Sequence, residues 1–185
     1  MTDELTTHLL VDGENIDATL GNSILGGRPA PEQRPRWDTV RQFTADHWGC
    51  GTNALFFLNA SSGSIPMSFV QALHAMDYRV VPLSGEPGEK VVDMAILATL
   101  KALRDRPGHV MLASHDGDFA EDLLALVDGQ RKIGILGFPE FVSQMFRADE
   151  TIEVLDIEDD ARAFTVSLPR LRIIPIAEFD PTRFL

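Results

Sequence analysis

The sequence predicts an α/β fold of three layers (α/β/α), in which a mainly parallel central sheet lies between two layers of helices. Short apolar runs recur along the chain, and segments of helix length separate them. Strands that alternate with helices are joined by right-handed crossovers, so neighbouring strands run parallel. The 185 residues, 44% of them hydrophobic, can bury one substantial core and favour a single domain.

Six apolar runs carry the strand pattern, the last of them more weakly. They are residues 8–11, 54–58, 79–82, 109–113, 132–136 and 151–155. Five other segments have the longer apolar spacing of helices, and Pro66 stands where a first helical turn tolerates proline. These predicted helices are residues 38–48, 67–76, 91–103, 118–127 and 140–146.

Two regions depart from this alternation. Residues 21–37 are rich in glycine and proline and are predicted to form a long loop. After Asp160, β-branched runs are interrupted by Pro169 and Pro175, which predicts a short C-terminal β extension, an edge hairpin or an arm. We therefore expect a domain over residues 1–160 and an extension over 161–185, packed on that domain or extending from it. Two copies of the chain could form a homodimer through this extension.

The charge of the chain limits its partners. The formal net charge is −12 and the pI is near 4.7, which opposes the broad basic surface of a protein that coats nucleic acid. An enzyme that contacts a few phosphates through a metal is not excluded. Seven acids between residues 149 and 160 are interpreted as a solvated charged face.

The N-terminal residues lack the basic and apolar regions of a signal peptide, and no apolar stretch reaches the roughly 20 residues that span a bilayer. The single cysteine, Cys50, cannot form an internal disulfide, which suits a reducing compartment. We expect a cytoplasmic protein with no membrane partner.

Carboxylates follow two of the predicted strands. Asp12 ends the first strand, and Asp116 and Asp118 follow the fourth in the stretch "LASHDGDF". Ligands of open parallel sheets bind at the carboxyl ends of strands, so these side chains should converge. Asp118 also stands where the N-cap of a helix belongs, and for this residue alone capping and metal binding are equally good interpretations.

Asp93 is a fourth candidate, because it lies in a predicted helix that is apolar almost all round. A buried carboxylate needs a basic partner, hydrogen bonds or a metal. Lys90 could be a structural ion-pair partner three residues earlier. Together with Asp12, Asp116 and Asp118, however, Asp93 completes an oxygen-rich site suited to Mg²⁺ or Mn²⁺. Such an ion activates water for phosphodiester hydrolysis, although phosphatase chemistry needs the same groups.

The stretches "LLVDGENID", "EKVVDMAILATL" and "LASHDGDFAEDL" occur in this order and span most of residues 8–127. Together they resemble the NYN domain family, a branch of the PIN-like metal-dependent ribonucleases. The resemblance implies a PIN-like, Rossmann-like fold, RNA as substrate, and metal binding and catalysis by Asp12, Asp93, Asp116 and Asp118. It also implies that Asn15 and Lys90 support the site or contact phosphate. The turn differs from the family pattern, because His115 and Gly117 stand where glycine and serine are common.

Arginines gather in and after the long loop. Arg28, Arg34 and Arg36 are candidates for binding substrate, and Trp37 among them could stack on an unpaired base. The alternative is a solvated loop in which Trp37 anchors the following helix.

Three functions remain open on these residues. The first is a Mg²⁺- or Mn²⁺-dependent endoribonuclease. The second is a non-catalytic RNA-binding or regulatory module, which the altered turn and the acidic surface favour. The third is a small-molecule phosphatase. We interpret His115 as a surface-loop residue, or as a proton donor to the leaving group.

Overall fold

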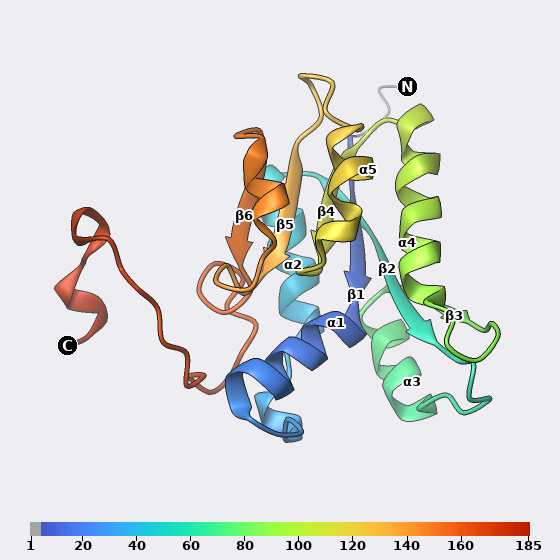
Figure 1. Ribbon diagram of the computed structural model, residues 1–185, viewed down its shortest axis with the longest axis horizontal. Coiled ribbons are helices and arrows are strands. Elements are labelled where there is room, and N and C mark those ends of the chain that lie inside the picture. Colours follow the sequence, from blue (N-terminus) through green and yellow to red (C-terminus); the bar gives the residue numbers. More distant parts are fainter. Residues whose placement is uncertain (1–4) are drawn as a thin grey trace.

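The computed structural model describes residues 5–185, apart from the side chain of Arg183, and confirms the predicted three-layer fold (Figure 1). A single sheet of six parallel strands has the order β3-β2-β1-β4-β5-β6. The strands are β1 (Thr6–Asp12), β2 (Gly51–Asn59), β3 (Tyr78–Leu83), β4 (His109–Ala113), β5 (Ile133–Gly137) and β6 (Ile152–Asp156). Each of the six predicted runs overlaps one of these strands, with bounds that differ by a few residues.

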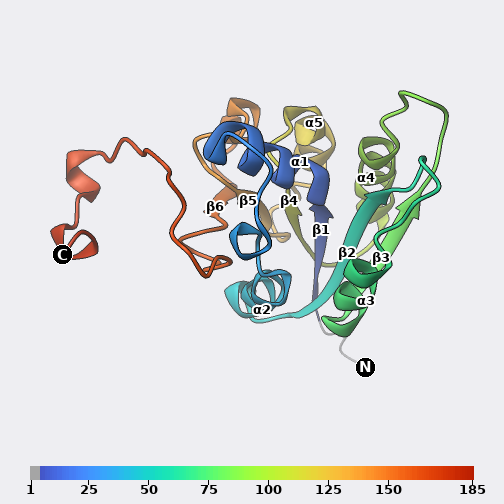
Figure 2. The ribbon, with the colours of Figure 1, turned by 90° about the horizontal axis from the view of Figure 1, so that it is seen from below.

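Helices cover both faces of the sheet. α2 and α3 lie on one face, and α4 and α5 lie on the other (Figure 2). The α-helices are α1 (Gly13–Ala18), α2 (Trp37–Trp48), α3 (Met67–Ala75), α4 (Val91–Ala102) and α5 (Ala120–Leu124). None of the helices in residues 5–185 combines the length and the hydropathy that crossing a bilayer requires.

Each face of the sheet has its own hydrophobic core. Leu9, Val11 and Phe56 point to the α2 and α3 side, and Leu10 and Phe57 point to the α4 and α5 side. Side chains alternate between the faces because the strand period is two residues. Every residue of β4 and β5 is buried, as expected for strands covered on both faces.

The predicted loop over residues 21–37 is partly wrong. A π-helix over Thr19–Leu25 continues α1, and a short 3-10 turn forms at Pro31–Gln33. The physical reason is helical spacing, because Ile16, Leu20 and Ile24 recur every four residues and pack against the core. The helix ends where Gly26 adopts a left-handed conformation, with φ of 70°.

The predicted helix over residues 140–146 is also wrong. A turn at Phe138–Phe141 is followed by a 3-10 helix over Gln144–Ala148, which begins where the Ser143 hydroxyl accepts a hydrogen bond from the Met145 amide. The predicted helix over residues 118–127 is shortened. It begins as a 3-10 turn at Gly117–Phe119, and its α-helical part is confined to α5.

The C-terminal segment contains no strand among residues 157–185, so the predicted β extension is wrong, and the segment forms an arm with two 3-10 turns (Ile176–Glu178 and Pro181–Arg183). Its first part is anchored by Arg170, whose side chain is 1% exposed. The guanidinium donates to Glu140, Asp156 and Glu158 at 2.6–2.9 Å. Asp156 and Glu158 therefore lie in buried ion pairs, whereas Glu150, Glu153 and Asp160 of the predicted solvated face are exposed. Beyond the anchor, the arm leads away from the domain (Figure 1).

Candidate active site

The strand order reverses between β1 and β4, which are adjacent and parallel, with Val11 paired to Ala113. In open parallel sheets, ligands bind outside the carboxyl ends of strands at such a reversal. The topology therefore brings Asp12, at the end of β1, next to the turn that follows β4. The sequence analysis predicted a site at this same edge of the sheet.

Asp12 is a buried carboxylate, 3% exposed. It accepts hydrogen bonds from the Asn15 amide at 3.2 Å and from the Ser114 hydroxyl at 3.1 Å. Among the described residues, no basic side chain lies within ion-pair distance of it. Burial, with a smaller contribution from the negative charges of Asp93 and Glu14, raises the pKa of Asp12 from 3.8 to about 6, although the two hydrogen bonds act in the opposite direction. The ionised form of Asp12 would be favoured by a nearby cation.

A lysine lies among the other acids of the site. The Lys90 Nζ is 3.4 Å from an oxygen of Asp93, at the first turn of α4, and 3.9 Å from an oxygen of Asp118. Its hydrogen bond to Asp93 and the charges of Asp93, Asp116 and Asp118 raise the pKa of Lys90. The ammonium is therefore the positive charge that offsets their mutual repulsion in this structure.

Asp116, rather than Asp118, caps the turn after β4. The Asp116 carboxylate accepts a hydrogen bond from the Asp118 amide at 3.0 Å, while the Asp118 side chain is 71% exposed. The capping role considered for Asp118 is wrong for this reason. A Cβ at Gly117 would lie 2.5 Å from the Ser143 hydroxyl oxygen. Ser143 thus places a hydroxyl beside the position where the NYN pattern has a serine.

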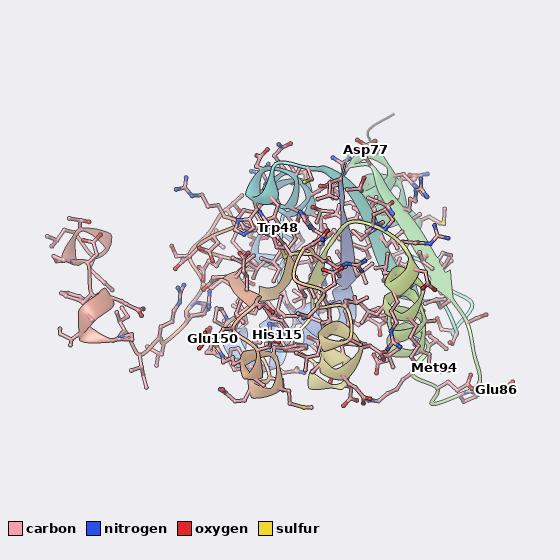
Figure 3. All side chains as sticks on the ribbon, turned by 90° about the horizontal axis from the view of Figure 1, so that it is seen from above. Trp48, Asp77, Glu86, Met94, His115 and Glu150 are labelled. Atoms are coloured by element: carbon pink, nitrogen blue, oxygen red, sulfur yellow. The ribbon has the colours of Figure 1, made fainter. Side chains whose placement is uncertain are left out.

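His115 is 6% exposed, so its interpretation as a surface-loop residue is wrong (Figure 3). Its Nε2 accepts a hydrogen bond from the Phe138 amide at 2.9 Å, which leaves the proton on Nδ1. The Nδ1 lies 2.8 Å from the Asn15 side-chain oxygen, which also accepts from the His115 amide at 2.9 Å. Burial lowers the pKa of His115 to about 4, so the ring is neutral and unsuited to donating a proton to a leaving group.

Asn15 and His115 together join the ends of two strands. Asn15 follows β1 in α1, and its side-chain oxygen holds the loop that follows β4. The His115 ring stacks on Phe138, with centroids 5.6 Å apart and planes 8° apart. The two residues fix the separation between Asp12 and Asp116. His115 is a positioning residue that the sequence analysis missed.

His115→Phe should destabilise the fold at pH 7 by about 1 to 3 kcal/mol, because the buried Phe138 amide loses its acceptor. The folded pKa of His115 lies below 6.5, so its stabilising contribution is complete above that pH and is lost as the pH falls toward 4. Urea unfolding at several pH values should show the wild-type advantage shrinking over this range. An advantage that stays constant from pH 7 to 4 would contradict the buried neutral ring.

The three candidate arginines lie at different places. Arg34 pairs with Asp17 at 3.5 Å, and Arg36 pairs with Asp38 at 2.9 Å. Both line a groove that also includes Gly13 and Glu14, next to Asp12. Arg28 is exposed in the loop after Gly26, is not part of this lining, and makes no ion pair with any described residue.

Trp37 is 7% exposed at the start of α2 and packs edge-on against Phe56, with ring centroids 5.0 Å apart. This contact agrees with its alternative role as an anchor of the helix.

The donor chemistry of the site suits a hard divalent ion, because Asp12, Asp93, Asp116 and Asp118 offer only oxygen ligands and Asp12 is buried without a cation partner. As the side chains stand, however, no group of three or more acidic, histidine or cysteine side chains in residues 5–185 is arranged to hold one ion. Lys90 lies between two of these acids.

Comparison with known proteins agrees with this architecture. The family model of the NYN domain matches residues 6–158. A crystal structure of a protein of unknown function from Vibrio parahaemolyticus superimposes with a TM-score of 0.67 and 18% sequence identity. The match covers 86% of this chain and 97% of the other, and at this identity it shows the fold alone. No curated protein matches significantly. The chain belongs to the NYN domain family, a PIN-like ribonuclease family.

Proposed function

We propose that this protein is a metal-dependent endoribonuclease that hydrolyses RNA phosphodiester bonds at the acidic edge between β1 and β4. The observation that carries this proposal is the buried Asp12, which has no cation partner among the described residues and whose pKa is raised by burial and, to a smaller extent, by the charge of Asp93. An RNA strand would bring a phosphate to this edge, and a divalent ion would neutralise the negative charges of both the carboxylates and the phosphate.

Each residue has a distinct role in the proposed reaction. Asp12, Asp93 and Asp116 would hold Mg²⁺ or Mn²⁺, whose chemistry is to activate a water and stabilise charge on the phosphate. Asp118 would orient a water from its exposed position. Lys90 would leave its acidic partners and contact the phosphate, as an exposed side chain can do. Asn15, through His115, keeps the two strand ends in register.

Asp116→Asn tests this proposal. We expect the purified wild-type chain to cleave mixed RNA substrates with Mn²⁺ or Mg²⁺, EDTA to stop the cleavage, and the variant to lose it. Asp105→Asn is the matched control, because Asp105 is an exposed carboxylate before β4, at the opposite edge of the sheet. A wild-type chain that leaves RNA intact, or an Asp116→Asn variant that cleaves like the control, would contradict the proposal.

A second candidate is a non-catalytic RNA-binding module of the same fold. The observation that favours it is the position of Lys90, which neutralises Asp93 and Asp118 where an ion would be needed. In that case the wild type and Asp116→Asn would bind RNA equally, and neither would cleave it.

We also propose that two copies pair through the C-terminal arm. Leu171, Ile173 and Ile176 are 97%, 100% and 87% exposed, and large exposed apolar side chains in one segment mark an interaction surface. Ile173→Asp should convert a dimer to a monomer in light scattering after gel filtration. Ser167→Asp, an exposed control in the same segment, should leave the dimer intact. A monomeric wild type, or a dimeric Ile173→Asp variant, would contradict the pairing.

A further inference from the structure

The groove beside Asp12 has an aromatic and aliphatic wall. It encloses about 440 Å³, within the size range of small-molecule sites, and its lining includes residues from α1, α2, β2 and α3. Its larger apolar side chains include Phe69, Leu58 and Met76, which are partly exposed, while the buried Trp37 and Phe56 form its floor. Phe56 and Phe69 contact edge to face, with centroids 5.5 Å apart.

The groove is continuous with the carboxylate edge. Gly13, which follows Asp12 directly, is part of its lining. A Cβ at Gly13 would lie 2.6 Å from the Phe56 ring, so a glycine allows the aromatic wall to reach the end of β1. A strand with one phosphate at the carboxylates would therefore present a neighbouring nucleotide to the groove.

The charges of the rim favour a neutral ligand with hydrogen-bond donors. The rim carries two arginines and three acids: Arg34, Arg36, Glu14, Asp17 and Asp38. Both arginines are paired with acids of the rim, and Glu14 is exposed without an ion-pair partner among the described residues. A phosphate is repelled by this balance. The exocyclic amino group of a base can donate to a carboxylate while its ring packs on aromatic side chains.

We propose that this groove is a nucleobase subsite, which binds an unpaired, amino-bearing base of the RNA strand next to the scissile phosphate. The inference rests on the proposed function, because it assigns the base-binding part of the same site. It also gives the chain a way to bind single-stranded RNA despite its acidic surface.

Ala72→Phe tests the subsite, since Ala72 lies exposed on α3 and lines the groove, which the larger side chain would fill. Gln71→Phe is the control, an exposed position on the same helix outside the lining. The probe is a fluorescent single-stranded heptamer of adenosines, compared with heptamers that lack one base at each position in turn. Anisotropy titrations are made with Ca²⁺ in place of Mn²⁺, because an oxygen-binding ion at the carboxylates offsets the repulsion of the strand's phosphates, and gel electrophoresis after each titration checks that the strand is intact.

We expect removal of the base at one position to weaken wild-type binding about 10-fold, in line with base stacking on aromatic side chains. Ala72→Phe should abolish this difference, and Gln71→Phe should keep it. Equal binding of all heptamers by the wild type, no binding of any heptamer, or an unchanged preference in Ala72→Phe would overturn the subsite.

A parallel cleavage assay with Mn²⁺ separates the two proposals. If the wild type cleaves RNA but binds all heptamers equally, the ribonuclease proposal stands and the subsite is contradicted. If removal of one base weakens binding but the wild type does not cleave RNA, the subsite stands and the ribonuclease proposal is contradicted.

Discussion

Asp12→Asn is expected to abolish metal-dependent RNA cleavage and at the same time to make the protein more stable. The loss should be at least about 1,000-fold, because a metal ion contributes several kcal/mol of transition-state stabilisation and 1.4 kcal/mol is about a factor of ten. The gain should be about 2 to 3 kcal/mol at pH 7, because burial makes the ionised carboxylate unfavourable. The amide can keep both hydrogen-bond contacts, since the Ser114 hydroxyl can also accept.

The increase in stability expected for Asp12→Asn depends on pH. The folded pKa of about 6 lies above the unfolded value of 3.8, so the cost of Asp12 is absent below pH 3.8 and grows as the pH rises through 6. Denaturant unfolding of the wild type and the variant should therefore give equal stabilities near pH 4 and diverging ones toward pH 7. A variant that is less stable than the wild type at pH 7 would contradict a buried, unpaired carboxylate.

Arg170→Met should lower the free energy of unfolding by about 3 to 5 kcal/mol, the usual cost of removing one partner of a buried ionic cluster. The substitution leaves Asp156 and Glu158, with side chains 9% and 14% exposed, without the guanidinium that donates to both. It also removes the contact of Arg170 with the Phe138 ring, 4.8 Å from its centroid. Since Phe138 stacks on His115, cleavage should fall as well.

Arg172→Met is the control for this prediction. Arg172 contacts the same acidic cluster, but its side chain is 34% exposed, so solvent screens the pairs and the loss should be about 1 kcal/mol or less. Urea unfolding of both variants at pH 7 provides the measurement. Equal losses in the two variants would show that the burial of Arg170 is not what makes it important.

The sequence predicted the sheet well, because the signal for each strand is local. Apolar runs such as residues 109–113 are the buried strands themselves, and Asp12 is the last residue of its strand while Asp116 lies three residues after the end of β4. Element alternation then placed both acids at one edge. Helix α4 was also predictable from its sequence, because it is 12 residues long and apolar at all positions except Asp93, Thr99 and Lys101.

The features that the sequence did not predict depend on contacts between distant segments. His115 is buried because the Phe138 amide, 23 residues away, supplies a donor to its ring. Asp156 pairs with Arg170 only because the chain turns back after β6. The groove is lined by residues of α1, α2, β2 and α3 and of the segments between them, and although the sequence indicated Arg34, Arg36 and Trp37 separately, it did not show that they lie beside Phe69 and Met76. Gly117 was visible as a departure from the family pattern, but the Ser143 hydroxyl beside it was not.

The most direct test of the acidic edge as a metal-dependent ribonuclease site is the rate of single-stranded RNA cleavage as a function of Mn²⁺ concentration, for the wild type and Asp93→Asn. Asp93 reaches this edge from α4, independently of β1 and β4. We predict saturable activation of the wild type, no activity in EDTA, and a loss of at least about 1,000-fold in the variant. Cleavage by Asp93→Asn at the wild-type rate, or no Mn²⁺-dependent cleavage by the wild type, would contradict it.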